Sequence, residues 1–234
     1  GSYKIPHFQQ SNPIAYAQYF LEFSEFIGFG KPRIKDRFPS CNLFCDRELF
    51  VKVGGFPPIR ASEDSLFGIE TSKYTNMVFF PSIAVCHIFR ETPGHFLSNQ
   101  KLLGKYIYIF RRKAYDSFYL KGFWPYLLIP LFLIFKISRI FVRVLKTNSH
   151  NIVYFFLSLP LFLMGTIEWG KGFISGIESY EEESEKIRFG PWFFVYLGCF
   201  SEVMIIKTLD RTSNSRISTN LPSRYFRFWS RTNQ

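Results

Sequence analysis

Two long apolar runs in the second half of the chain constrain its fold more than any other feature. The first run, Trp124–Phe135, contains no charged residue, and the second, Ile152–Ile167, is followed directly by Glu168. Each run is shorter than the roughly 20 residues that a straight helix needs to cross a bilayer, so tilt or extension into the flanks is required. We interpret the pair as an α-helical membrane hairpin within residues 121–176; a hairpin buried in a protein core is the alternative.

The composition supports a chain that is associated with a membrane. Hydrophobic residues make up 47% of the 234 residues and aromatic residues 20%, including 30 Phe. This aromatic content exceeds that of an ordinary soluble domain and fits contact with lipid. The net charge of +11 favours anionic partners. Because no nucleic-acid motif is legible, lipid head groups and sugar phosphates are better candidates than nucleic acid.

Basic residues follow the first apolar run at helical spacing. Lys136, Arg139, Arg143 and Lys146 recur three or four residues apart and predict one basic face of a continuing helix. Such a face can extend its charged groups to phosphates at a membrane surface. Residues 101–121 are also strongly basic. By the positive-inside rule, these residues are expected on the cytoplasmic side of the membrane.

Residues 177–234 are expected to form an acidic loop, a short apolar segment and a basic aromatic tail. The sequence YEEESE of Tyr180–Glu185 is typical of a solvated loop. The apolar segment Trp192–Ile206 is expected to lie on the membrane surface, because a third crossing would export the basic tail. The tail ends in RYFRFWSR, which alternates rings and charges as peripheral membrane anchors do.

Residues 1–120 are predicted to contain alternating short helices and strands, an α/β arrangement. The spacing of apolar residues and the positions of glycine and proline predict helices over Ile14–Ile27, Asp46–Val53, Glu63–Lys73 and Gly94–Tyr108, and strands at Ser40–Phe44, Met77–Phe80 and Ile83–Val85. Asp46 is expected near a helix N-terminus, where the dipole favours it, and Ser62 is expected to cap the next helix.

Two adjacent acids, Glu63 and Asp64, are the foremost candidates for chemistry. They follow a Gly-Gly turn and a Pro-Pro turn and stand at a predicted helix start. The helix dipole and its free amides are expected to keep a carboxylate ionised there, which suits a general base. Simple capping of the helix is the competing interpretation.

Four other features are weaker when each is taken alone. A single histidine after a strand, such as His87, is more often packed than a metal ligand, and a Gly54–Gly55 pair usually ends a helix. Asn42, on a predicted strand, is equally ambiguous. The cysteines do not have the spacing of a zinc site, so we interpret them as buried, reduced thiols; they are Cys41, Cys45, Cys86 and Cys199.

The order of these features resembles the acceptor-side half of family 2 glycosyltransferases, inverting enzymes with a GT-A fold. The matching residues are Asn42, Arg47, Glu48, Phe50, Val53, Gly54, Gly55, Phe56, Glu63, Asp64, Pro81 and His87. The helix sequence YAQYFLEFSEF and the later segment LPLFLMGTIEWGKGFISG are similar to flanking parts of that family. The resemblance covers residues 1–176 and implies a partial GT-A-like domain over residues 1–120, followed by the membrane hairpin.

The resemblance also implies roles for individual residues. Asp64 is expected to be the catalytic base and Glu63 its neighbour in the acceptor site. His87 is expected near the diphosphate and a divalent metal, Mg or Mn, as a candidate ligand. The acceptor pocket is expected to be shaped by Asn42, Gly54 and Gly55.

The implied function is transfer of a sugar from a nucleotide-diphospho-sugar to a lipid-linked or membrane-surface glycan acceptor by inverting displacement. The enzyme would be an integral membrane hexosyltransferase of cell-envelope polysaccharide synthesis, with its catalytic part in the cytoplasm. No D-x-D motif occurs in the sequence, so the donor and most metal ligands are expected to belong to an N-terminal half outside it. The Q-x-x-R-W motif of processive members is also missing, which favours single-sugar transfer. A non-catalytic membrane anchor or interaction module is the alternative.

Overall fold

The computed structural model describes residues 1–115 and 117–188, with side chains up to residue 184. The apolar segment Trp192–Ile206, the basic tail and Cys199 lie outside the described residues. The α-helices are α1 (Pro13–Phe23), α2 (Arg47–Val53), α3 (Glu63–Ser72), α4 (Pro93–Ala114), α5 (Trp124–Leu145), α6 (Ser149–Leu157), α7 (Leu159–Glu178) and α8 (Tyr180–Arg188). Single 3-10 turns are η1 (His7–Gln9), η2 (Ser24–Phe26), η3 (Ser40–Asn42) and η4 (Phe118–Leu120).

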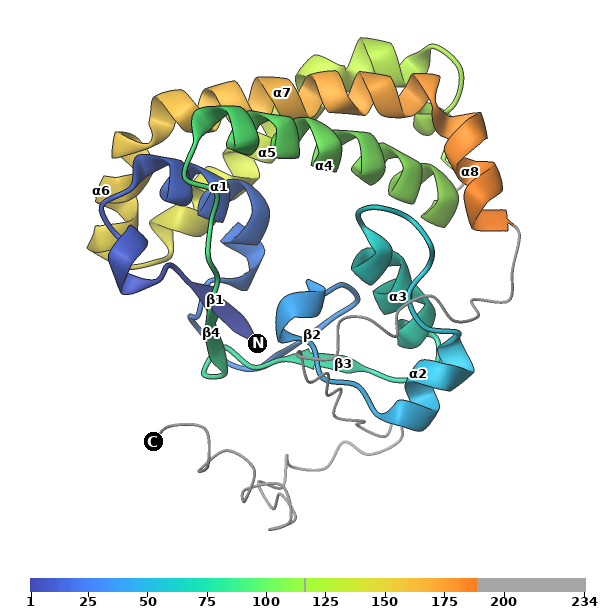
Figure 1. Cartoon of the computed structure of the whole chain (residues 1–234), viewed down its shortest axis with the longest axis horizontal. Helices are drawn as coiled ribbons and strands as arrows, with labels where there is room; N and C mark the ends of the chain where they lie inside the picture. The colour runs from blue at the N-terminus through green and yellow to red at the C-terminus, as the bar shows by residue number, and fades with distance from the viewer. Residues whose placement is uncertain (116, 189–234) are drawn as a thin grey trace.

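The strands form two separate pairs rather than one sheet. Strand β1 (Ser2–Lys4) runs parallel to β4 (Ala84–Cys86), and β2 (Arg33–Lys35) runs antiparallel to β3 (Met77–Phe79). Both pairs lie below α1, α4 and α7 in Figure 1. The expected mixture of helices and strands is confirmed in this coarse form, but the described chain is mostly helical and its strands are short.

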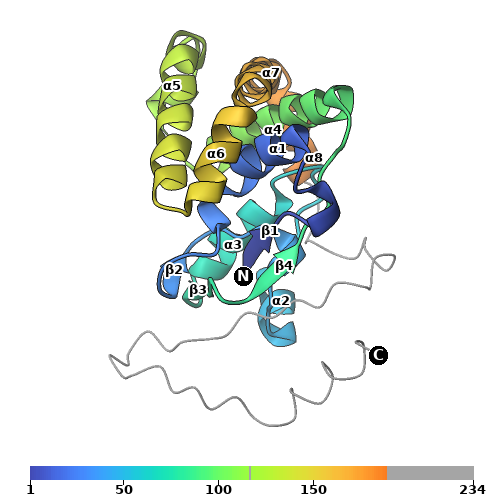
Figure 2. The ribbon, with the colours of Figure 1, turned by 90° about the vertical axis from the view of Figure 1, so that its left-hand side faces the viewer.

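Helices α4 and α7 lie side by side and form a layer above the strands (Figures 1 and 2). Their backbones approach closely because glycines line the contact. A Cβ atom at Gly104 would collide with the carbonyl oxygen of Trp169, and one at Gly172 would collide with that of Lys101. Glycine is therefore required at both positions for this helix pair to form.

The main apolar core connects the first 120 residues to the segment that follows. The ring of Phe20 in α1 packs against Phe155 in α6, with 5.5 Å between centroids, and Phe155 packs against Phe162 in α7 at 5.1 Å. All three rings are buried. A second cluster forms around Trp169 and Phe173 of α7. Helices α6 and α7 therefore have one side packed on the preceding part of the chain.

The predicted membrane hairpin is only partly reproduced. The first apolar run and the basic residues after it form one helix, α5, as expected. The second run is not a single helix, because α6 and α7 meet at 70° around Ser158. Pro160, at the second position of α7, lacks a backbone N–H and fits the first turn of a new helix, where that N–H would have no partner. Among the described residues, no single helix is long and apolar enough to cross a membrane, and the bent α6–α7 pair alone meets those criteria.

The outer side of α5, α6 and α7 is covered by exposed apolar side chains, which we call the outer apolar face. Figure 2 shows α5 along the edge of the helical layer. The face consists of Trp124, Leu127, Leu131, Ile134, Phe135, Val142, Leu145, Val153, Phe156, Leu157, Leu163, Met164 and Ile167. Exposed apolar side chains gathered on three neighbouring helices favour contact with lipid or with a partner.

Two local predictions are wrong. The first part of the predicted strand Ser40–Phe44 is the 3-10 turn η3, where the Ser40 N–H bonds to Asp64 instead of to a neighbouring strand. The predicted acidic loop Tyr180–Glu185 belongs to helix α8. Glu183 is buried there and accepts a hydrogen bond from Lys105 Nζ at 3.0 Å. An ion pair between residues distant in the sequence thus stabilises a segment whose acidic composition is typical of a solvated loop.

Candidate functional site

The two candidate acids stand at the start of α3, as predicted, and Asp64 is held by backbone amides. Its Oδ2 accepts a hydrogen bond from the Ser40 N–H at 3.1 Å, and its Oδ1 accepts one from the Ser65 N–H at 2.6 Å. Asp64 therefore joins the first turn of α3 to η3. Each oxygen of an ionised carboxylate has a second lone pair, so Asp64 can still accept a proton.

Burial controls the charge of both acids. Burial raises the pKa of Asp64, although the hydrogen bonds from Ser40 and Ser65 oppose this shift. Burial, followed by repulsion from Asp64, raises the pKa of Glu63 to about 7. At Glu63 desolvation outweighs the amides and the dipole, so this carboxyl is partly protonated near neutral pH, and the expectation that the helix N-terminus keeps a carboxylate ionised is wrong for Glu63. A pKa near neutrality suits a group that exchanges protons during a reaction.

The residue before the acid pair has an unusual backbone. Ser62 has a φ of 65°, and it is the one described non-glycine residue with positive φ. Ser62 is the N-cap residue of α3, as predicted, but its side chain makes no capping hydrogen bond. Left-handed conformations of such residues are strained and concentrate at functional sites. The strain lies directly beside the two acids.

Tyr3 connects the acid pair to His87. Tyr3 was not among the candidate residues predicted from the sequence. The Tyr3 hydroxyl donates to the carbonyl of Pro39 at 3.1 Å, next to the Ser40 amide that binds Asp64. The Tyr3 ring centroid is 6.3 Å from that of His87. Burial raises the pKa of Tyr3, and the nearby charge of Asp64 contributes. Only the tertiary fold reveals this contact, since Tyr3 is 61 positions before Asp64.

His87 is packed among aromatic rings. Its ring centroid is 4.9 Å from that of Phe23 and 4.8 Å from that of Phe89. Burial lowers the pKa of His87, and the charge of Arg90 lowers it further, so the imidazole is neutral at pH 7. Its Nδ1 is buried and has no hydrogen-bond partner among the described residues. His87 therefore offers one unbonded nitrogen at the edge of the site.

The described residues do not assemble a divalent metal site around His87. Within residues 1–115 and 117–184, no group of three His, Cys, Asp or Glu side chains is arranged to hold a metal ion. One histidine nitrogen without a nearby carboxylate is too few ligands for Mg or Mn. Cys41 and Cys45 are half-buried and Cys86 is exposed.

Asn42 and the two glycines have structural contacts. Asn42 Nδ2 donates to the carbonyls of Ser2 at 2.9 Å and Ile83 at 3.3 Å, which fastens the β1–β4 pair. Gly54 and Gly55 have φ values of 93° and 72° and end α2. These contacts explain why the residues are needed for the fold. Their role in an acceptor pocket remains a prediction.

A separate cavity of about 270 Å³ lies between β1, α1 and the start of α6. Its lining includes Tyr3, Tyr16, Asn148 and His150, but neither of the two candidate acids. Tyr16 Oη lies 2.8 Å from His150 Nε2 within this lining. The cavity and the acid pair are thus different features that share Tyr3.

The chain matches no known family, and no similar curated protein or solved structure was found. The residues and their geometry are therefore the basis for assigning a function to this chain.

Proposed function

We propose that this chain is the acceptor-side part of a membrane-bound glycosyltransferase. It would transfer a sugar from a nucleotide-diphospho-sugar to a lipid-linked or membrane-surface glycan acceptor, with inversion at the anomeric carbon. The observation that carries the proposal is the Glu63–Asp64 pair, which combines raised pKa values with a strained residue at the start of α3. The order of this pair and His87 along the chain supports it.

The proposed mechanism assigns proton transfer to Asp64. Asp64, oriented by the Ser40 and Ser65 amides, takes the proton of the acceptor hydroxyl as that oxygen attacks the anomeric carbon. The new bond between oxygen and carbon forms while the bond from carbon to the diphosphate oxygen breaks. The diphosphate leaves with the electron pair, and the proton remains on Asp64. Glu63, which is partly protonated near neutral pH, would hydrogen-bond the acceptor.

The helices after residue 121 would hold the enzyme in the membrane. The outer apolar face and the bent α6–α7 pair support this part of the proposal. The basic residues of 101–121 would then lie at the cytoplasmic surface, where the donor is expected. This arrangement suits an enzyme of cell-envelope polysaccharide synthesis.

Replacement of the proposed base tests the mechanism. In the full natural chain, Asp64→Asn is expected to lower the rate of transfer by at least about 100-fold while donor binding is unchanged. Glu70→Gln, at an exposed site on the same helix, is the matched control and should leave the rate unchanged. Thermal unfolding of each variant separates lost chemistry from lost folding. Full activity of Asp64→Asn would refute the assignment of Asp64 as the base.

A non-catalytic membrane module is the second candidate. One observation favours it, namely that both oxygens of Asp64 already accept backbone hydrogen bonds, as in a purely structural role. In that case the wild-type chain would show no sugar transfer, and Asp64→Asn would change only the stability of the fold.

A further inference from the structure

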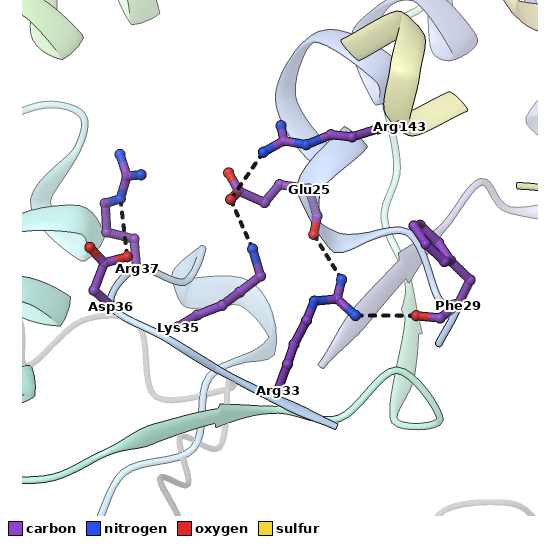
Figure 3. A network of polar contacts seen from close by, with 7 residues as sticks. All are labelled: Glu25, Phe29, Arg33, Lys35, Asp36, Arg37 and Arg143. Atoms are coloured by element: carbon purple, nitrogen blue, oxygen red, sulfur yellow. Dashed lines mark hydrogen bonds and ion pairs between the residues drawn. The ribbon is translucent and has the colours of Figure 1, made fainter. Parts of the chain in front are cut away.

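Basic side chains from three parts of the chain converge between β2 and α5. We call this group the cation cluster; its members are Lys35, Arg37, Arg111, Lys136, Arg139 and Arg143. Figure 3 shows Arg143 extending from α5, with Lys35 and Arg37 on the segment below it. Arg143 Nη2 and Lys35 Nζ lie 3.2 and 2.8 Å from the same oxygen of Glu25. The predicted basic face of α5 is thus directed in part toward the protein.

Arg111 joins the cluster from the last turns of α4. Arg37, whose guanidinium is 5.9 Å from the ring centroid of Phe110, lies against this part of α4. Burial lowers the pKa of Arg111 to about 10, and the positive charges of Arg139 and Arg37 contribute to that shift. The three guanidinium groups are therefore within electrostatic range of one another.

The described carboxylates do not balance these charges. Glu25 is shared by Lys35 and Arg143, and Glu22 accepts hydrogen bonds from the amides of Asn99 and Gln100. Among the described residues, neither Arg111 nor Arg139 has a carboxylate within ion-pair distance.

Arg37 is also incompletely paired. Asp36 Oδ1 lies 3.5 Å from Arg37 Nε, and this nitrogen is buried without a hydrogen bond. A buried donor without an acceptor costs free energy that a bound anion would recover.

Guanidinium groups respond to repulsion from neighbouring positive charges differently from other ionisable groups. They do not lose their proton in proteins, so repulsion among Arg37, Arg111 and Arg139 cannot be relieved by neutralisation. An anion with several oxygens can accept bidentate hydrogen bonds from more than one of them. Phosphate has this geometry and carries enough charge to offset the repulsion.

The surroundings of the cluster indicate what the phosphate is attached to. The Arg139 guanidinium lies 5.7 Å from the ring centroid of Phe135, and Phe135 is part of the outer apolar face. Leu131 and Ile134 lie on the same exposed surface of α5. The cation cluster and an extended apolar surface therefore meet on one helix, which is the combination that a phosphate with a hydrocarbon tail requires.

We propose that Arg37, Arg111 and Arg139 bind the phosphate group of a phosphate-bearing lipid whose hydrocarbon tail lies along the outer apolar face. The identification of this lipid as the sugar acceptor rests on the proposed function. The binding itself does not depend on Asp64, and it can be measured without any sugar transfer.

Flotation of the full natural chain with lipid vesicles tests the proposal. The vesicles contain phosphatidylcholine with phosphatidic acid, which carries a phosphomonoester, or with phosphatidylglycerol at the same surface charge. Arg111→Gln and Arg139→Gln are each expected to weaken binding to the phosphatidic acid vesicles by about tenfold, the effect of one charge-assisted hydrogen bond. The wild-type chain is expected to prefer these vesicles to the phosphatidylglycerol vesicles.

Arg112→Gln is the matched control. It removes the same charge from the next position of α4, where Arg112 lies 5.3 Å from the ring centroid of Tyr180. Binding by this variant should fall by less than about threefold, because only screened long-range attraction is lost. Equal losses for Arg111→Gln and Arg112→Gln would overturn the proposal in favour of diffuse electrostatics.

Three further measurements complete the test. Equally tight binding of soluble pyrophosphate, without vesicles, would overturn the assignment to a lipid. Asp64→Asn is expected to bind the vesicles like the wild type, so a failure of the proposed catalytic chemistry leaves this result intact. Thermal unfolding of Arg111→Gln checks that any loss of binding occurs in a folded protein.

Discussion

The acid pair and the cation cluster both bring like charges together, but they respond to it in opposite ways. Glu63 and Asp64 can take up protons, and the raised pKa of each carboxyl shows that burial favours the neutral form. Arg37, Arg111 and Arg139 have no neutral form within the physiological pH range. Repulsion between acids is therefore relieved by protonation, whereas repulsion between guanidinium groups is relieved only by an anion.

This difference indicates which region can act as a proton acceptor and which as an anion site. A carboxylate whose pKa lies near neutrality exchanges protons readily, as a base must. A fixed set of guanidinium groups keeps its charge and instead selects a ligand of complementary charge. Three effects on stability are expected from this difference.

The largest expected effect is at Glu25, the internal counter-ion of the cation cluster. Glu25→Gln is expected to lower the free energy of unfolding by about 2 kcal/mol, because Lys35 and Arg143 lose their shared carboxylate. Glu70→Gln breaks an exposed pair with Lys73 and should cost less than about 0.5 kcal/mol. Chemical denaturation at pH 7 measures both values. Equal, small losses would mean that the cluster is solvated rather than internally paired.

The second effect concerns the pH dependence that Glu63 introduces. Its pKa is raised from 4.5 to about 7 in the folded protein, so the folded state binds more protons than the unfolded state between these values. The contribution of Glu63 to stability is therefore fully present below about pH 4.5 and is lost as the pH rises through about 7. Glu63→Gln is expected to reduce this fall by about 1 kcal/mol, allowing for partial solvent exposure.

Thermal unfolding between pH 5 and pH 8 measures this effect. Some dependence on pH should persist in Glu63→Gln, because the pKa of Asp64 is raised as well. Glu48→Gln changes an exposed acid in the first turn of α2 and serves as the control. If Glu63→Gln and the wild type had the same profile, the raised pKa of Glu63 would be refuted.

The smallest expected effect is a gain in stability on removing one member of the cation cluster. Arg111→Gln is expected to raise the free energy of unfolding by about 0.5 kcal/mol in lipid-free detergent, because it relieves repulsion from Arg37 and Arg139. Phosphatidic acid should stabilise the wild type more than this variant. A loss of stability for Arg111→Gln without lipid would show that the cluster is already neutralised within the protein.

Local sequence patterns predicted most of the helices. The helices at Asp46–Val53 and Glu63–Lys73 appear as α2 and α3 within one residue, and the helix after Trp124 continues through its basic residues as α5. These elements follow from apolar spacing and from nearby glycines, which act over a few residues. The prediction of a strand at Ser40–Phe44 was wrong because strand pairing depends on a distant partner. Asp64 binds the turn at Ser40 instead.

The candidate site was also predicted only in part, because short-range patterns are visible in the sequence and long-range contacts are not. Two neighbouring acids at a helix start are visible in the sequence, so Glu63 and Asp64 could be selected. The contact of Tyr3 with His87 and the position of Arg111 near Arg37 and Arg139 could not be predicted, because each joins residues far apart in the chain. The charge states of Glu63 and Asp64 could not be predicted from the sequence either, since desolvation depends on how deeply the folded chain buries each group.

The sequence alone determined the apolar runs, the basic character of the chain and the placement of two acids at the start of a helix. These properties depend on composition and on short-range spacing. The tertiary structure decided that the second apolar run bends at Ser158, that burial raises the pKa of both acids, and that guanidinium groups from three segments meet beside an apolar surface. Such outcomes depend on packing and desolvation, which only the folded arrangement of distant residues establishes.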